Sequence, residues 1–264
     1  MHRQRILSAL LLIPLFLLLV QFGTPFYFVL LISAAIALAA WEFSCLCPVG
    51  GDAGLSLVTV VGGLAWHAAA IGRGDAALVG VLVVVAGLVR ATLCRAELQV
   101  NILQAAWTVL GVVYVGGLLS FASLLRMLPE GRELIYLLTF TTWVGDTAAF
   151  YVGSRFGQHF LAPRISPKKT VEGALGGIGA AVVMAMAGSV WVWPRIGLAS
   201  AASVGLLLAI VCILGDLCES VVKRAAAAKD SGNLIPGHGG ALDRLDSLMF
   251  ACPTLYVLAW LGWV

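Results

Sequence analysis

The sequence predicts an all-α, polytopic integral membrane protein with about nine transmembrane helices. Of its 264 residues, 61% are hydrophobic and only 11% are charged, whereas soluble domains are about 45–50% apolar and about 25% charged. The apolar residues also form long runs, each roughly long enough to cross about 30 Å of hydrocarbon as a helix. These two observations exclude soluble globular, disordered, collagen-like and disulfide-scaffold proteins.

Nine apolar windows are expected to form the spans. They lie near residues 6–20, 26–44, 55–72, 76–94, 102–125, 134–153, 174–194, 201–218 and 248–264. The first window could also belong to a signal peptide, but no small-x-small cleavage site follows it, so we interpret it as a retained span. The third and fourth windows are separated only by the short Gly-Arg-Gly-Asp segment at 72–75.

The distribution of basic residues predicts a cytoplasmic N-terminus. With nine spans, twelve of the sixteen Lys and Arg residues fall on the side of the N-terminus and four on the other, in agreement with the positive-inside rule. Eight of the twelve lie in two polar loops, at about 154–173 and 219–247. We therefore divide the chain into N-terminal scaffold helices, 1–130, and a C-terminal catalytic region, 131–264, that contains both loops.

The net charge and the cysteines indicate no partner besides the bilayer. The formal net charge is +3, and no basic tail suggests a nucleic acid. The six cysteines are scattered in or beside apolar segments, without a second Cys/His pair at zinc spacing. We interpret them as packing residues.

Asp146 is the first polar residue that points to function. It lies inside or at the cytoplasmic end of the sixth window. A carboxylate at membrane depth is costly and usually faces a polar cavity. An interfacial ion pair with Arg155 is the alternative interpretation, so the position alone leaves both open.

A second polar cluster precedes the seventh window. Lys168 and Lys169 stand just before an apolar helix that Thr170 or Ser166 would cap, with Glu172 in its first turn. Two lysines at a helix N-terminus on a membrane surface suit a phosphate group. Lysines that only set the topology are the alternative.

The end of the eighth window carries a third cluster. Asp216 and Glu219 are three residues apart and share a helix face, and Lys223 follows one turn later. A solvated extension of the span would have the same pattern. Asp216 does not fit a solvated extension, because it follows directly on apolar residues and should lie near the hydrocarbon boundary.

The fourth cluster is rich in glycine. Three glycines surround His238, and such a loop allows the backbone to approach a ligand closely. A helix is expected to resume near Leu242, where Asp243 and Asp246 are again three residues apart. Carboxylates beside lysines and a glycine loop fit Mg²⁺ that is held by one or two carboxylates plus substrate phosphates. A solvated acidic surface is the alternative.

The ordered run from Ser220 to Asp246 resembles the signature of phosphatidate cytidylyltransferases, also called CDP-diacylglycerol synthases. The residues that carry the resemblance are Ser220, Lys223, Arg224, Lys229, Asp230, Gly232, Ile235, Pro236, His238, Gly239, Gly240, Asp243, Arg244 and Asp246. The segments 166–173 and 146–153 are also similar to that family, so the resemblance covers about residues 140–250. Upstream, only the hydropathy and the Trp41-Glu42-Phe43 patch match. Ala241 departs from the pattern, since the family usually has a larger aliphatic residue there.

The resemblance implies transfer of CMP from CTP to phosphatidic acid, which gives CDP-diacylglycerol and pyrophosphate. The lipid phosphate is then the nucleophile, and because the second pKa of a phosphomonoester is near 6, it is mostly ionised at neutral pH. No covalent Ser or Cys and no strong general base are needed. The enzyme must instead position two polyanions and stabilise charge on the leaving pyrophosphate.

Residue roles follow from the clusters and the resemblance together. The expected Mg²⁺ ligands are Asp146, Asp216, Asp243 and Asp246. The expected catalytic residues are Asp216, Lys223, Arg224, Lys229, Asp243 and Arg244. The expected substrate-binding residues are Ser166, Lys168, Lys169, Ser220, Gly237, His238, Gly239 and Gly240. The family also suggests a second, monovalent cation, and the sequence leaves open whether the protein is a homodimer.

Two other functions fit only part of the sequence. A transporter would use intramembrane acids such as Asp146 and Asp216 as ion-coupling sites, but it gives no reason for a glycine-histidine loop beside Asp243 and Asp246. A CDP-alcohol phosphotransferase would need an Asp-Gly-x2-Ala-Arg motif, which the sequence lacks. We therefore expect a cytidylyltransferase in the bacterial cytoplasmic membrane, with its active site facing the cytoplasm.

Overall fold

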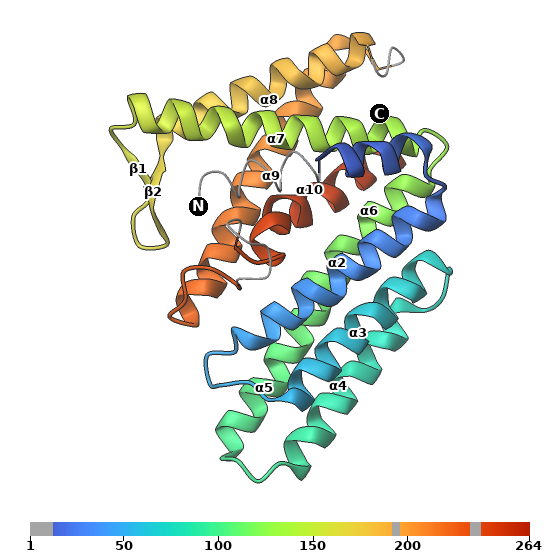
Figure 1. Cartoon of the computed structure of the whole chain (residues 1–264), viewed down its shortest axis with the longest axis vertical. Coiled ribbons are helices and arrows are strands. Elements are labelled where there is room, and N and C mark those ends of the chain that lie inside the picture. The colour runs from blue at the N-terminus through green and yellow to red at the C-terminus, as the bar shows by residue number, and fades with distance from the viewer. Residues whose placement is uncertain (1–12, 192–195, 233–238) are drawn as a thin grey trace. The chain divides into compact units, whose positions relative to one another are not determined.

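A computed structural model describes residues 13–191, 196–232 and 239–264, and these are predominantly helical, as predicted (Figure 1). Six helical segments within them are long and apolar enough to cross a membrane. They are Pro25–Cys45, Ala53–Ile71, Ala76–Leu93, Leu98–Met127, Val171–Val190 and Leu198–Ala225. The count of nine spans and the cytoplasmic N-terminus stay predictions, and the start of the first window lies outside the described residues.

The described elements follow the order of the chain. Their order is α2 (Pro25–Cys45), α3 (Ala53–Ile71), α4 (Ala76–Leu93), α5 (Leu98–Gly111), the π-helical η1 (Val112–Gly117), α6 (Leu118–Met127), α7 (Gly131–Phe156), β1 (Phe160–Ala162), β2 (Ser166–Thr170), α8 (Val171–Trp191), α9 (Leu198–Ala225) and α10 (Leu242–Trp260). The chain forms two compact units. Unit 1 comprises 1–124 and 222–245, and unit 2 comprises 125–221 and 246–264.

Unit 1 is built around α3, which packs against α2, α4 and η1. At the end of α2, the Phe43 ring stacks on Trp107 with 4.7 Å between centroids, and the Trp107 indole N–H donates to the Phe43 carbonyl at 2.9 Å. The π-helical turn brings Gly116 so close to Gly63 that a Cβ at Gly116 would lie 2.6 Å from the Gly63 Cα. A π-helical turn can bend a helix. The Phe43 and Trp107 contacts hold the end of α2 against α5.

Unit 2 is held together by a seam of small residues between α7 and α8. A Cβ at Gly177 would lie 2.9 Å from both the Ala149 Cβ and the Gly145 carbonyl oxygen, and one at Gly173 would lie 2.8 Å from the Ala149 carbonyl oxygen. Small residues at four-residue spacing let two membrane helices approach until their backbones touch. This close packing explains the glycines of the 146–153 and 166–173 segments.

The seam also explains an element that the sequence analysis did not predict. The expected loop at 154–173 contains an antiparallel hairpin, in which Phe160 pairs with Thr170 and Ala162 with Ser166. Strands this short have no alternating pattern to reveal them, and they form because α7 and α8 bring their ends together. The predicted cap is confirmed, since the Thr170 hydroxyl accepts the Gly173 N–H at 3.2 Å.

Candidate functional site

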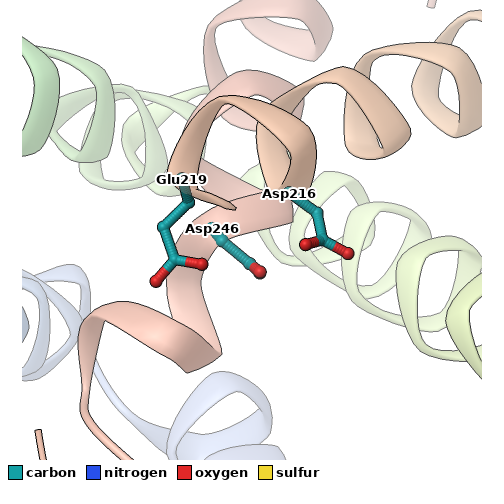
Figure 2. Close-up of side chains that lie close together, drawn as sticks. All are labelled: Asp216, Glu219 and Asp246. Atoms are coloured by element: carbon teal, nitrogen blue, oxygen red, sulfur yellow. The ribbon is translucent and has the colours of Figure 1, made fainter. Parts of the chain in front are cut away.

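Three carboxylates gather in unit 2. Asp216 and Glu219 lie one turn apart on α9, and Asp246 lies on α10 (Figure 2). One oxygen from each can be chosen so that all three lie within 4.8 Å of one another. Glu219 is fully buried and the other two are partly exposed. The predicted shared face of Asp216 and Glu219 is therefore present, and it faces Asp246.

Two neighbours shape this carboxylate cluster. Gly215 permits the approach of α10, because a Cβ there would lie 2.7 Å from the carbonyl oxygen of Asp246. Lys169, on β2, forms an ion pair with Asp216, and both side chains are partly exposed. The hairpin thus supplies a cation to a group of acids that would otherwise repel one another. Lys168, its neighbour, is exposed.

Asp243 has a different environment, in unit 1. Its Oδ1 accepts from the Lys223 ammonium at 2.7 Å, and its Oδ2 accepts from the Ser231 N–H at 3.0 Å, the Ser231 hydroxyl at 3.1 Å and the Gly240 N–H at 3.0 Å. Only 8% of the Asp243 side chain is exposed. Burial raises the pKa of Asp243, but the hydrogen bonds from Lys223, Gly240 and Ser231 together lower it more, so the pKa lies below its ordinary value.

The glycines beside Asp243 have a local reason. Gly239 has φ of +82° and a Cβ there would lie 2.9 Å from Asp243 Oδ2. That backbone region strongly favours glycine. The helix then begins at Leu242, as predicted. Gly237 and His238 lie outside the described residues.

Glu42 contacts the same region, although the sequence analysis gave it no role. It lies on α2 with 1% of its surface exposed and accepts hydrogen bonds from Ser231, Ala241 and Leu242. The signal that could have revealed it was a carboxylate in an otherwise apolar window. From the sequence, the patch around Glu42 contributed only to the family resemblance.

The other predicted residues are distributed over both units. Asp146 is an exposed residue of α7 that lines a small pocket with Thr141, Thr142 and Cys212 in unit 2. Ser220 is buried on α9, and Ser166 is partly buried on β2. In unit 1, Arg224, Lys229 and Arg244 are exposed. The Arg224 guanidinium donates to the Ala228 carbonyl at 3.1 Å.

Comparison with known proteins identifies the relatives of the chain. Residues 3–261 match the family described as the cytidylyltransferase family. Enzymes named phosphatidate cytidylyltransferase from Staphylococcus saprophyticus and Staphylococcus aureus are each 38% identical over 158 residues, which is 60% of this chain and 60% of theirs. One of the same name from Synechocystis is 45% identical over 129 residues, which is 48% of this chain and 43% of the relative. The chain thus spans about three fifths or less of the length of these relatives.

Proposed function

The chain belongs to the cytidylyltransferase family, and from this premise we propose that it transfers CMP from CTP to phosphatidic acid, with CDP-diacylglycerol and pyrophosphate as products. The names of the staphylococcal and Synechocystis relatives support the choice of substrates. The single observation that carries the proposal is the cluster of Asp216, Glu219 and Asp246. A group of oxygen donors is what a nucleotidyl transfer with Mg²⁺ requires.

The proposed reaction is a displacement at phosphorus. An oxygen of the lipid phosphate attacks the α-phosphorus of CTP and forms a new P–O bond. The bond from the α-phosphorus to the oxygen that bridges to the β-phosphorus breaks, and pyrophosphate leaves with the electron pair. Because the lipid phosphate is already ionised near neutral pH, no side chain has to remove a proton.

The donor set fits Mg²⁺. Asp216, Glu219 and Asp246 offer only oxygen, which a hard divalent cation prefers, and their mutual repulsion favours a bound cation. When bound, the ion would neutralise charge on the triphosphate and the leaving pyrophosphate. Asp146 and Asp243 were also expected as ligands. Because both oxygens of Asp243 already accept hydrogen bonds, we propose that it orients Lys223 instead of binding the ion. The part of Asp146 in metal binding stays a prediction, as does a second, monovalent cation.

Basic and hydroxyl residues are proposed to bind phosphates. Lys168 and Lys169 suit this role because the hairpin holds both just before α8, where Lys169 pairs with Asp216. In unit 1, Lys223 is oriented by Asp243, and exposed cations follow it along the chain. The proposed phosphate ligands in this unit are Lys223, Arg224, Lys229 and Arg244, with the glycine loop. Ser166 and Ser220 are proposed as further hydroxyl donors.

We place the protein in the bacterial cytoplasmic membrane, with both polar loops in the cytoplasm, where CTP is found. The apolar helices and the basic character of the two loops support this arrangement. In a cysteine-free background, Lys168→Cys should react with a membrane-impermeant thiol reagent only in inside-out vesicles. Labelling of intact spheroplasts instead would overturn the orientation.

The decisive assay uses purified protein in detergent with phosphatidic acid, Mg²⁺ and α-labelled CTP. We expect label in the lipid phase, dependent on Mg²⁺. Asp216→Asn should abolish the labelling of the lipid. Glu97→Gln should not, because Glu97 is exposed and belongs neither to the carboxylate cluster nor to the surroundings of Asp243. Absence of label from folded wild-type protein would refute the function, whereas label that survives in Asp216→Asn would refute the assignment of the cluster. Unlabelled dCTP as a competitor would define the nucleotide preference.

A further inference from the structure

Glu42 is a buried carboxylate that joins three segments of unit 1. Its Oε1 accepts the Ala241 N–H at 2.9 Å, and its Oε2 accepts the Leu242 N–H at 2.8 Å and the Ser231 hydroxyl at 2.9 Å. These partners stand 189 to 200 positions further along the chain. The first N–H groups of a helix have no partner within it, so a side chain from α2 satisfies the start of α10.

Ser231 connects Glu42 to Asp243. Its hydroxyl lies 2.9 Å from Glu42 Oε2 and 3.1 Å from Asp243 Oδ2. A hydroxyl carries one hydrogen, so the two carboxylates share a single donor. The Ser231 N–H donates to Asp243 as well, and Asp243 in turn accepts from Lys223. The contacts therefore run from Glu42 through Ser231 and Asp243 to the Lys223 ammonium.

The space around Glu42 accounts for two glycines of the family signature. A Cβ at Gly240 would lie 2.3 Å from Glu42 Oε2 and 2.1 Å from the Ser231 hydroxyl oxygen. A Cβ at Gly232 would lie 2.7 Å from Glu42 Oε1. The backbone at Gly232 and at Gly240 is therefore in close contact with this carboxylate, and neither position has room for a side chain.

We propose that Glu42 is a positioning residue for the proposed cytidylyl transfer, and that it acts through Ser231 on Asp243 and Lys223. The inference rests on the proposed function, because Lys223 is taken there to bind a substrate phosphate. Glu42 also fixes the direction in which α10 starts, and so the place of Asp243 itself. A misplacement of about 1 Å in such a group can cost about 100-fold in rate.

Glutamine cannot replace Glu42 in this role. The Ser231 hydroxyl and the Ala241 and Leu242 N–H groups all donate to Glu42, whereas an amide has one oxygen and one NH₂ group. In Glu42→Gln the NH₂ group must face at least one backbone N–H or the Ser231 hydroxyl, and a buried donor is left without an acceptor. Ser231→Ala removes only the link to Asp243, and Ser231→Thr retains a hydroxyl.

The test measures kcat and the KM for CTP at a temperature where each variant is folded, together with the melting temperature. We expect Glu42→Gln to lower kcat about 10- to 100-fold and Ser231→Ala to lower it less. The double variant should match Glu42→Gln alone, because both changes interrupt one path. Ser231→Thr should recover most of the loss. Asn101→Ala serves as the control, since it removes buried hydrogen bonds to the Ala91, Cys94 and Ala96 carbonyls and should lower only the melting temperature.

Each result decides the proposal. The proposal would be overturned if the losses in kcat of Glu42→Gln and Ser231→Ala multiplied in the double variant. It would also be overturned if folded Glu42→Gln had the kcat of wild type. If Glu42→Gln does not fold, the Ser231 pair decides: loss in Ser231→Ala with recovery in Ser231→Thr supports the path, and wild-type kcat in both refutes it. Wild-type protein that makes no CDP-diacylglycerol would instead refute the proposed function.

Discussion

Asp243 and Asp246 stand three residues apart at the start of one helix, yet their surroundings differ. Asp243 accepts hydrogen bonds from Lys223, Ser231 and Gly240 within unit 1. Asp246 lies in unit 2 beside the carboxylates of Asp216 and Glu219. A motif with two identical acids can therefore combine one carboxylate that the protein has neutralised with another that it has placed among like charges.

This difference predicts different consequences of mutation. A carboxylate surrounded by donors stabilises the fold, and its removal leaves those donors without an acceptor. A carboxylate among other acids destabilises the fold unless a cation is present, and its removal relieves repulsion. Loss of Asp246 should therefore reduce activity more than stability, and loss of Asp243 should reduce stability directly.

The largest effect is expected at the carboxylate cluster. Asp216→Asn and Asp246→Asn should each lower the rate of CDP-diacylglycerol formation about 10³-fold, since each removes a ligand of the proposed Mg²⁺. Asp216→Asn also removes the ion pair with Lys169, but both side chains are partly exposed, so its loss should change the melting temperature little. Rates within twofold of wild type, with Glu97→Gln as the control, would contradict the proposed role of the cluster.

The buried ion pair should dominate the stability of its region. Lys223 and Asp243 are only 13% and 8% exposed, and removal of one partner of a buried pair costs about 3–5 kcal/mol. Asp243→Asn should therefore lower the free energy of unfolding by an amount of this order. Lys223→Met in the same chain should recover part of it, as denaturant titration in detergent can measure. Strictly additive losses would show that the two groups do not interact.

The seam between α7 and α8 offers a smaller test of unit 2, whose hairpin brings Lys169 to Asp216. Gly177→Ala introduces a Cβ 2.9 Å from Ala149 and Gly145 atoms, whereas Gly179 has open space around it. Gly177→Ala should cost about 1–3 kcal/mol of stability, and Gly179→Ala should stabilise the helix by about 0.5–1 kcal/mol. Equal effects of the two alanines would contradict the close packing of this seam.

The smallest expected effect is a pH dependence. Because the pKa of folded Asp243 is below its ordinary value, its stabilising contribution is present above the unfolded pKa, near 4, and is lost as the pH falls through the folded pKa. The difference in melting temperature between wild type and Asp243→Asn should be constant above about pH 5 and narrow below pH 4. A difference that widens with acid would contradict the sign of the shift.

The sequence predicted features that depend on residues close together in the chain, and it missed those that depend on distant segments. The shared face of Asp216 and Glu219 and the start of α10 near Leu242 depend on neighbours within one or two turns, and both were predicted. The cap of α8 is equally local, and Thr170 was one of the two residues expected for it. The hydrogen bonds of Glu42 and the different partners of Asp243 and Asp246 join segments that are distant in the chain. The hairpin was missed for a similar reason, since the packing of α7 against α8 brings its ends together.

The most direct test of the contrast between Asp243 and Asp246 is to measure Mn²⁺ binding to the purified protein without nucleotide. Electron paramagnetic resonance reports this binding. Mn²⁺ prefers the same oxygen ligands as Mg²⁺. We expect one bound ion in wild type, lost in Asp216→Asn and Asp246→Asn and retained in Asp243→Asn when that variant is folded. Binding that is lost in folded Asp243→Asn but survives in Asp246→Asn would contradict it.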